Sequence, residues 1–321
     1  MSSLMRTVGL ACVALGVGLA GGTADAADKV RLVISQKMPF ELFAPELAQR
    51  EGHFKAENLD VSMIYATGGA ETLQAIITGS QDVTTGNGTL GVIAAYAKGA
   101  PLTIIASSGR GTGDVFWYVP TASPIKTLKD LDGKELVFSR PGSTTHLIAQ
   151  LLAKQAGGNV KLVSVGGMSA SRTQVMSGQV ATGWAAFPAN YELIRKGEAR
   201  ILAKGDEATA LQGDSIRVVV ANSNWLKANR DVAARFMRAH WKGIQGLYTA
   251  KGVEQYAKLW DIPLEDAKRA PDFVPMKNLT YNPVGNLDGL IQQAIALKMI
   301  NGPLTPDKRK AMVDIVWEPG K

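Results

Sequence analysis

Cysteine is nearly absent from this sequence of 321 residues, and its single occurrence, Cys12, lies inside an apolar run near the N-terminus. Past that run the chain has no residue for a disulfide, a thiol nucleophile or a cysteine-ligated zinc ion. Histidine is also scarce, because His53, His146 and His240 lie far apart and no clustered acids or H-x-x-x-H pattern accompanies them. The sequence therefore predicts no metal site.

Runs of basic residues and catalytic motifs are missing as well. The formal net charge is +7, but lysine and arginine are scattered, which argues against nucleic acid as a partner and suits a small acidic ligand. No G-x-S-x-G element is present, and the glycines of residues 109–113 have no Walker lysine after them. These absences predict no catalytic residue and no cofactor.

The only long apolar run is short for a membrane span. Residues 8–20 form an unbroken apolar stretch of 13 residues, preceded by Arg6 and followed by Ala-Asp-Ala at residues 24–26. This layout is typical of a secretory signal peptide with an A-x-A cleavage site. We predict a signal peptide over residues 1–26, cleavage that leaves Ala27 first, and export of a soluble product. Because Cys12 lies within the run and not after it, lipidation is not predicted.

The first third of the exported part alternates between strand and helix patterns. Strands are predicted at residues 30–34, 59–65, 82–85 and 102–106, and helices between them at residues 43–50, 72–78 and 90–98. A β-α-β-α-β-α-β order of this kind favours an open α/β sheet.

The stretch of residues 139–145 stands between a buried strand pattern, residues 135–138, and a helix pattern that starts at His146. Pro141 and Gly142 form the turn, and Ser143 or Thr144 can cap the helix. Such a helix start offers unpaired N–H groups, hydroxyl donors and the positive end of a dipole, which together suit a small anion. The alternative is a capped helix without a ligand.

The chain also partly repeats itself. A Gly-Gly pair, a helix, a glycine stop and a short strand occur over residues 68–83 and again over residues 166–183, which predicts two lobes built alike. Strands at residues 200–203 and 215–222 follow. After Trp225 the pattern is helical, with candidate helices at residues 230–248, 253–260, 264–270, 286–299 and 305–316.

Four short motifs, in this order and spacing, resemble those of a known family. They are Glu-Gly-His-Phe at residues 51–54 with Leu-Asp-Val at 59–61; Gly68-Gly69 with Ala75, Gly79 and Asp82; Lys-Gly-Ala-Pro-Leu at 98–102; and Ile-Lys-Thr-Leu-Lys-Asp-Leu-Asp-Gly-Lys at 125–134. Nearly the whole exported chain resembles the periplasmic substrate-binding proteins of ABC importers, of the nitrate/sulfonate/taurine type within the NMT1/THI5-like superfamily.

The resemblance implies an α/β protein with the type II periplasmic-binding-protein fold, in which two lobes with open mixed sheets are joined by a two-segment hinge. Lobe 1 would comprise residues 27–114 and 216–321, and lobe 2 residues 115–215. It further implies a periplasmic monomer that does no chemistry and delivers a small ligand to an ABC permease. Trp184 and Phe187 favour an organic anion, such as a sulfonate or carboxylate, as that ligand. A ligand-sensing periplasmic protein and an enzyme related to pyrimidine synthases remain alternatives, although those synthases depend on cysteines.

The ligand would lie between the lobes, at loops after the strands. The predicted ligand-binding residues are Gln36, Lys37, Gly68, Gly69, Asn87, Arg140, Ser143, Thr144, Thr145, Trp184 and Phe187.

Several of these residues have a structural alternative. Asn87 is either a ligand contact or a turn residue, and Trp184 with Phe187 either stack on the ligand or belong to the core. Gln36 and Lys37 suit a solvated loop equally well. His146 fits a first-turn helix residue better than a ligand contact. Three arginines, at positions 110, 140 and 172, fit surface or inter-lobe roles, and Arg140 is the best placed of them to hold an anion.

Overall fold

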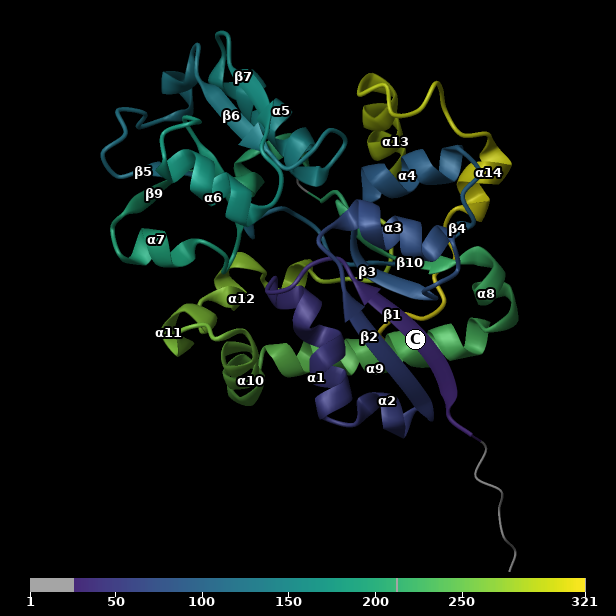
Figure 1. Cartoon of the computed structure of the whole chain (residues 1–321). Helices are drawn as coiled ribbons and strands as arrows, with labels where there is room; N and C mark the ends of the chain where they lie inside the picture. Colours follow the sequence, from purple (N-terminus) through teal and green to yellow (C-terminus); the bar gives the residue numbers. More distant parts are fainter. Residues whose placement is uncertain (1–25, 212, 321) are drawn as a thin grey trace, which may run out of the picture.

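The computed structural model describes residues 26–211 and 213–320, and its strands fall into two groups (Figure 1). The first group is a five-stranded mixed sheet in the order β2-β1-β3-β10-β4. Strand β1 pairs in parallel with β2 and β3, whereas β10 runs antiparallel to β3 and β4. The strands are β1 (Asp28–Ile34), β2 (Leu59–Tyr65), β3 (Val83–Gly88), β4 (Leu102–Ser107) and β10 (Arg217–Asn222).

The second group contains the strands from the middle of the chain. Strand β5 pairs antiparallel with β8 and β9, and β6 pairs in parallel with β7. The two small sheets are tied together by Trp117, whose buried indole Nε1 donates to the Val137 carbonyl oxygen at 2.7 Å. The strands are β5 (Val115–Pro120), β6 (Glu135–Phe138), β7 (Lys161–Ser164), β8 (Gly183–Ala186) and β9 (Ala199–Lys204).

Helices cover the five-stranded sheet on both faces, with α1, α2 and α9 on one side and α3 and α4 on the other (Figure 1). Helix α9 packs closely against α1, and the absence of a side chain at Gly243 allows this. A Cβ atom on Gly243 would lie 2.2 Å from the Ala44 carbonyl oxygen. The α-helices are α1 (Ala44–Arg50), α2 (His53–Ala56), α3 (Gly69–Ile77), α4 (Thr89–Ala97), α5 (Thr144–Ala156), α6 (Met168–Met176), α7 (Tyr191–Arg195), α8 (Ser223–Ala228), α9 (Arg230–Leu247), α10 (Ala250–Trp260), α11 (Leu264–Ala267), α12 (Ala270–Phe273), α13 (Leu287–Ala296) and α14 (Pro306–Ala311). Short 3-10 helices are η1 (Phe40–Phe43), η2 (Leu128–Leu131), η3 (Gly205–Glu207), η4 (Thr209–Leu211) and η5 (Met276–Asn278).

Each predicted strand and helix has a counterpart in the structure, but α2 and α7 were not predicted, and the largest errors in strand boundaries are at β3 and β8. Strand β3 does not stop at Thr85; it continues to Gly88, because Asn87 and Gly88 pair with Val218 and Arg217 of β10. Strand β8 lies at Gly183–Ala186 and not at residues 179–183, because these residues pair with β5. In both cases the partner strand is distant in sequence, so local pattern could not set the boundary.

The helices near the C-terminus are shorter than predicted. Residues 264–270 do not form one helix, because the chain begins a new one, α12, with Pro271 in its first turn. Helix α14 ends at Ala311 and not at residue 316, and Val313 forms a parallel bridge with Ile104 at the edge of the sheet. Pairing with β4 therefore keeps the end of the chain extended.

The chain passes between the two groups of strands twice, after β4 and before β10 (Figure 1). Ser215 ties the second passage to the first sheet, since its hydroxyl lies 2.8 Å from that of Ser107 and accepts from the Gly285 N–H at 2.8 Å. The division into lobes at residues 115 and 215 stays a prediction. Helix α12 contacts the second group, because Phe273 stacks on Phe187 with ring centroids 4.2 Å apart.

The predicted signal peptide and Cys12 lie outside the described residues, apart from Ala26. Within residues 26–211 and 213–320, no helix is both long enough and apolar enough to cross a bilayer. The same part of the chain contains no group of three or more histidine, cysteine or acidic side chains placed to hold a metal ion.

The stability of the fold should depend on pH through His240 on α9. The imidazole is buried beside the Tyr281 hydroxyl, with which Nδ1 shares a hydrogen bond, and burial lowers its pKa to about 4. The unfolded chain takes up a proton near the usual histidine pKa of about 6.5, whereas the folded chain takes it up only near pH 4. Stability is therefore lost as pH falls through this window, by about 3 kcal/mol for this group.

We expect His240→Gln to remove that part of the pH dependence, as measured by denaturant unfolding at about pH 7.5 and about pH 4.5. His53→Gln is the matched control, because the His53 side chain is partly exposed on α2. If the free energy of unfolding changes by the same amount between the two pH values in the wild-type protein and in H240Q, His240 is not the source of this pH dependence.

Candidate functional site

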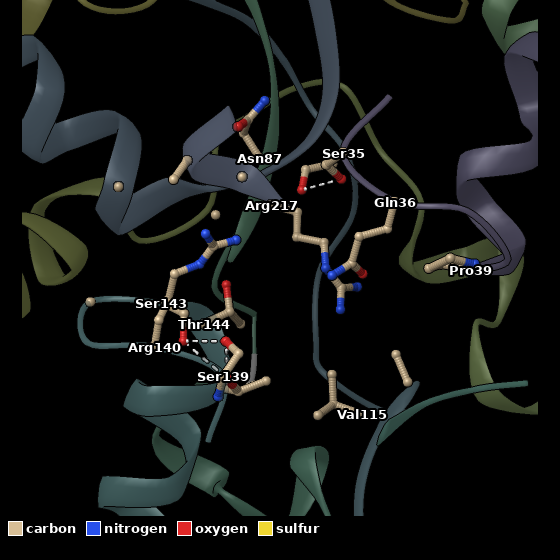
Figure 2. Close-up of a pocket in the computed structure, with 18 of the residues that line it drawn as sticks. Ser35, Gln36, Pro39, Asn87, Val115, Ser139, Arg140, Ser143, Thr144 and Arg217 are labelled. Carbon is tan, nitrogen blue, oxygen red and sulfur yellow. Dashed lines mark hydrogen bonds between the residues drawn. The ribbon is translucent and has the colours of Figure 1, made fainter. Parts of the chain in front are cut away.

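The candidate site is a cavity of about 230 Å³ between the two groups of strands. Figure 2 shows Arg140, Ser143 and Thr144 on one side of it and Ser35, Asn87 and Arg217 on the other. The cavity is lined by Ser35, Gln36, Pro39, Glu41, Leu42, Gly69, Ala70, Leu73, Gly86, Asn87, Gly88, Gly91, Val115, Ser139, Arg140, Pro141, Gly142, Ser143, Thr144, Thr145, Trp184, Ala186, Arg217 and Met299. Eight of the eleven residues predicted from the sequence are among them; Lys37, Gly68 and Phe187 are not.

The loop before α5 supplies the hydroxyl-rich side of the cavity. Ser143 is the N-cap predicted from the sequence, and its Oγ accepts from the His146 N–H at 3.2 Å. The turn requires Gly142, whose φ of 75° lies in the left-handed region. The Thr145 hydroxyl accepts from the Ser139 N–H at 2.9 Å and lies 3.0 Å from the Ser143 hydroxyl. These two hydroxyls therefore hold the loop in shape.

Thr144 differs from its neighbours. Its hydroxyl has no hydrogen-bond partner among the described residues, and its N–H and that of Thr145 belong to the first turn of α5, where no helical acceptor exists. Thr144 lines the cavity and is half-buried. The start of α5 thus offers one hydroxyl and two backbone donors, together with the positive end of a helix of 13 residues.

Arg140 extends from the same loop to the opposite side of the cavity. A Cβ atom on Gly68 would lie 1.9 Å from Nη2 of Arg140, so only glycine allows the guanidinium to lie there. Gly68 is the N-cap of α3, and its neighbour Gly69 lines the cavity. Among the described residues Arg140 forms no salt bridge. The pKa of Glu71 is lowered mainly by hydrogen bonds from Thr67, with a smaller contribution from the Arg140 charge, so the guanidinium is only weakly paired.

Asn87 was predicted as either a ligand contact or a turn residue, and the turn assignment is wrong. It is a fully buried residue of β3. Its amide nitrogen donates to the Thr84 hydroxyl at 2.7 Å, and its amide oxygen accepts from the Thr72 hydroxyl at 2.7 Å. Asn87 therefore joins β3 to α3 and fixes the wall of the cavity.

A charged cluster of Arg217, Glu41 and Asp114 was not predicted from the sequence; Arg217 and Glu41 line the cavity, and Asp114 contacts Arg217. Arg217, the first residue of β10, lies with Nη1 3.2 Å from Glu41 Oε1 and Nη2 2.7 Å from Asp114 Oδ2. Burial raises the pKa of Glu41 to about 7, although Arg217 opposes that rise. The pKa of Arg217 is raised above its usual value, because the attraction of Asp114 and Glu41 outweighs the effect of burial. An arginine at the start of an otherwise apolar strand was the available signal.

The two predicted aromatic residues separate in the structure. Trp184 lines the cavity from β8, and its indole Nε1 donates to the Gly166 carbonyl oxygen at 3.2 Å. Phe187 is only 1% exposed and packs between Tyr191 and Phe273. The expectation that Phe187 stacks on a ligand is corrected, because α12 covers its ring; the core alternative holds for this residue.

The remaining charged candidates lie away from the cavity lining. Lys37 is exposed, and its ammonium lies 6.0 Å from the centroid of the Tyr65 ring, as the solvated-loop alternative predicted. Arg172 pairs with Glu192. His146 sits in the first turn of α5, where its Nδ1 accepts from the Gly142 N–H at 3.0 Å.

A comparison with family models and solved structures gives consistent results. The NMT1/THI5 like model matches residues 43–250. The alkanesulfonate-binding protein SsuA of Xanthomonas axonopodis pv. citri, bound to MOPS, superposes with a TM-score of 0.70 at 21% identity, covering 84% of this chain and 92% of its own. The periplasmic aliphatic sulphonate binding protein SsuA of Escherichia coli has a TM-score of 0.70 at 21% identity, covering 88% and 97%.

A more distant match is the periplasmic nitrate-binding protein NrtA of Synechocystis PCC 6803, with a TM-score of 0.58 at 16% identity, covering 76% of this chain and 70% of its own. No curated protein matches the chain. At these identities the structural likeness shows a shared fold, and the fold class predicted from the sequence is confirmed.

Proposed function

The chain belongs to the NMT1/THI5-like family, and from that premise we propose that it is the solute-binding component of an ABC importer. In this role it captures a small organic anion, such as a sulfonate or carboxylate, in the cavity and delivers it to a membrane permease. The proposal includes export to the periplasm by a cleaved signal peptide and action as a monomer without catalysis.

One observation carries the proposal. The start of α5 directs the Thr144 hydroxyl and two backbone N–H groups, all without a partner in the described part of the chain, at a cavity lined by both groups of strands. Donors in this arrangement match the oxygens of a sulfonate or carboxylate head group. Arg140, which comes from the same loop and extends across to Gly68, adds a positive charge to the cavity lining. The neighbours named above bind sulfonates and nitrate according to their descriptions, which supports an oxyanion.

The apolar part of the cavity lining favours a ligand with a hydrocarbon part over a bare inorganic anion. Apolar side chains from η1, α3, β5, β8 and the segment after α13 contribute, namely Leu42, Leu73, Val115, Trp184 and Met299. A ligand site with mostly apolar walls and a few oriented polar groups is typical of small-molecule recognition.

Contacts at the rim connect ligand capture to closure. Arg140 lies against Gly68, and a Cβ atom on Gly88 would lie 3.0 Å from the Thr144 hydroxyl, so the loop before α5 already meets the first sheet. A ligand held by both sides adds contacts that an open form lacks, and it therefore favours the closed form.

A thermal-shift screen tests the proposal with butane-1-sulfonate, butanoate and nitrate, and with butan-1-ol as the uncharged control. We expect the organic anions to raise Tm and the alcohol to leave it unchanged. A ligand at about 100 times its Kd stabilises the folded state by about 2.7 kcal/mol. Correctly folded protein that none of the anions stabilises would contradict the proposed function.

A further inference from the structure

We propose that the cluster of Arg217, Glu41 and Asp114 beside the cavity rejects a second negative charge, so that the ligand is an organic monoanion or zwitterion and not a dianion. This inference rests on the proposed function and specifies the ligand class for the same site. It follows from the charges of Arg217 and of the two carboxylates that contact it, Glu41 and Asp114.

The cluster carries more negative than positive charge. Two carboxylates, Glu41 and Asp114, face one guanidinium, that of Arg217, and with all three groups ionised the net charge is −1. The Glu41 and Asp114 side chains are 6% and 4% exposed, so water screens them poorly. Arg217 is therefore already neutralised and is not a free anion receptor.

Arg217 still has donors to offer. A guanidinium carries five N–H groups, of which the two carboxylates occupy only part, and 20% of the side chain is exposed. Arg217 lines the cavity, where Figure 2 shows its side chain pointing inward. A neutral acceptor, such as a hydroxyl or carbonyl, can bind there without adding charge, and an ammonium group is attracted by the carboxylates.

The part of the cavity lined by the loop before α5 carries a positive charge, that of Arg140. Arg140, unlike Arg217, forms no salt bridge with the described residues, and it lies on the same loop as the Thr144 donors. A single anionic head group is therefore accommodated beside Arg140 and Thr144. The far end of the same ligand then meets the negatively charged cluster.

Protonation of Glu41 should weaken this charge filter. The charged or titratable groups facing Glu41 are Arg217 from β10, Asp114 before β5, and two tyrosines, Tyr248 after α9 and Tyr256 on α10. Glu41 Oε2 has no hydrogen-bond partner in the described structure, and burial raises the pKa of the carboxyl to about 7. Below that pH Glu41 is neutral and the net charge of the cluster falls to zero.

The test uses three ligands of matched length: butane-1-sulfonate as monoanion, 3-aminopropane-1-sulfonate as zwitterion and 4-sulfobutanoate as dianion. Isothermal titration gives their Kd values at about pH 8 and about pH 6. We expect the dianion to bind about tenfold to a hundredfold more weakly than the monoanion at the higher pH, and the gap to narrow at the lower pH.

Glu41→Gln should reduce the ratio of the dianion Kd to the monoanion Kd at about pH 8 and remove the dependence of that ratio on pH. Glu57→Gln, which loses a carboxylate outside the cavity, should change neither the ratio nor its pH dependence. If E41Q fails to fold, the two pH values on the wild-type protein decide. A dianion that binds as tightly as the monoanion at about pH 8 overturns the charge filter. Absence of binding by all three compounds, together with absence of stabilisation by butanoate and nitrate, overturns the proposed function itself.

Discussion

Replacing Arg217 with methionine should lower the free energy of unfolding by about 3–5 kcal/mol near pH 8. The substitution keeps the apolar stem but leaves Glu41 and Asp114 as buried carboxylates without their cation. Removing one member of a buried ion pair costs more than the pair contributes, because the remaining charge has neither water nor a partner.

The loss should shrink as pH falls. In the folded wild-type protein burial already raises the pKa of Glu41 to about 7, against a usual value of 4.5, and loss of Arg217 raises it further. An acid whose folded-state pKa is raised binds its proton more tightly in the folded chain, so stability falls as pH rises through that pKa. Denaturant unfolding at about pH 8 and about pH 5 measures both effects.

Arg230→Met is the matched control, because Arg230 pairs with Asp314 on the surface and the two side chains are 55% and 40% exposed. An exposed pair of this kind contributes under about 1 kcal/mol. If R217M lowers the free energy of unfolding by no more than R230M does, Arg217, Glu41 and Asp114 do not form the buried ion network that their geometry indicates.

Replacing Thr144 with valine should weaken the binding of butane-1-sulfonate about tenfold to a hundredfold, with little change in stability. Valine keeps the shape of threonine and removes only the hydroxyl, which has no partner in the described structure. A hydrogen bond to a charged group contributes about 1.5–3 kcal/mol, which corresponds to this loss of affinity. The Ser143 cap remains in place, so α5 keeps its start.

Isothermal titration of wild-type and variant proteins gives the two Kd values. Thr173→Val on α6 is the matched control, because its hydroxyl is exposed and bonds to the Ser169 carbonyl oxygen outside the cavity. Equal Kd values for T144V and T173V would show that the start of α5 does not hold the head group through this hydroxyl.

Most of the fold could be predicted because its signals are local. Strand β2 has the predicted boundaries, since alternation over residues 59–65 requires only that one face be buried. The capped start of α5 follows from Ser143, which needs only the helix behind it. The order of four short motifs was sufficient to indicate the family and, with it, the fold class.

What remained open depended on distant partners. Whether Phe187 faced a ligand or the core was decided by Phe273 on α12, and the end of β3 was decided by β10, more than a hundred residues later. Arg217 could be read as the start of an apolar strand, but nothing near it in sequence indicates that Glu41 and Asp114 surround it.

The sequence alone therefore determined the alternation of strands and helices, the cap of α5 and the family resemblance, because each depends on residues close together in the chain. Only the tertiary structure decided which groups share the cavity and what net charge the cluster of Arg217, Glu41 and Asp114 carries. Segments far apart in sequence come together to bury apolar surface, and that burial sets the neighbours, and so the electrostatics, of every side chain at the site.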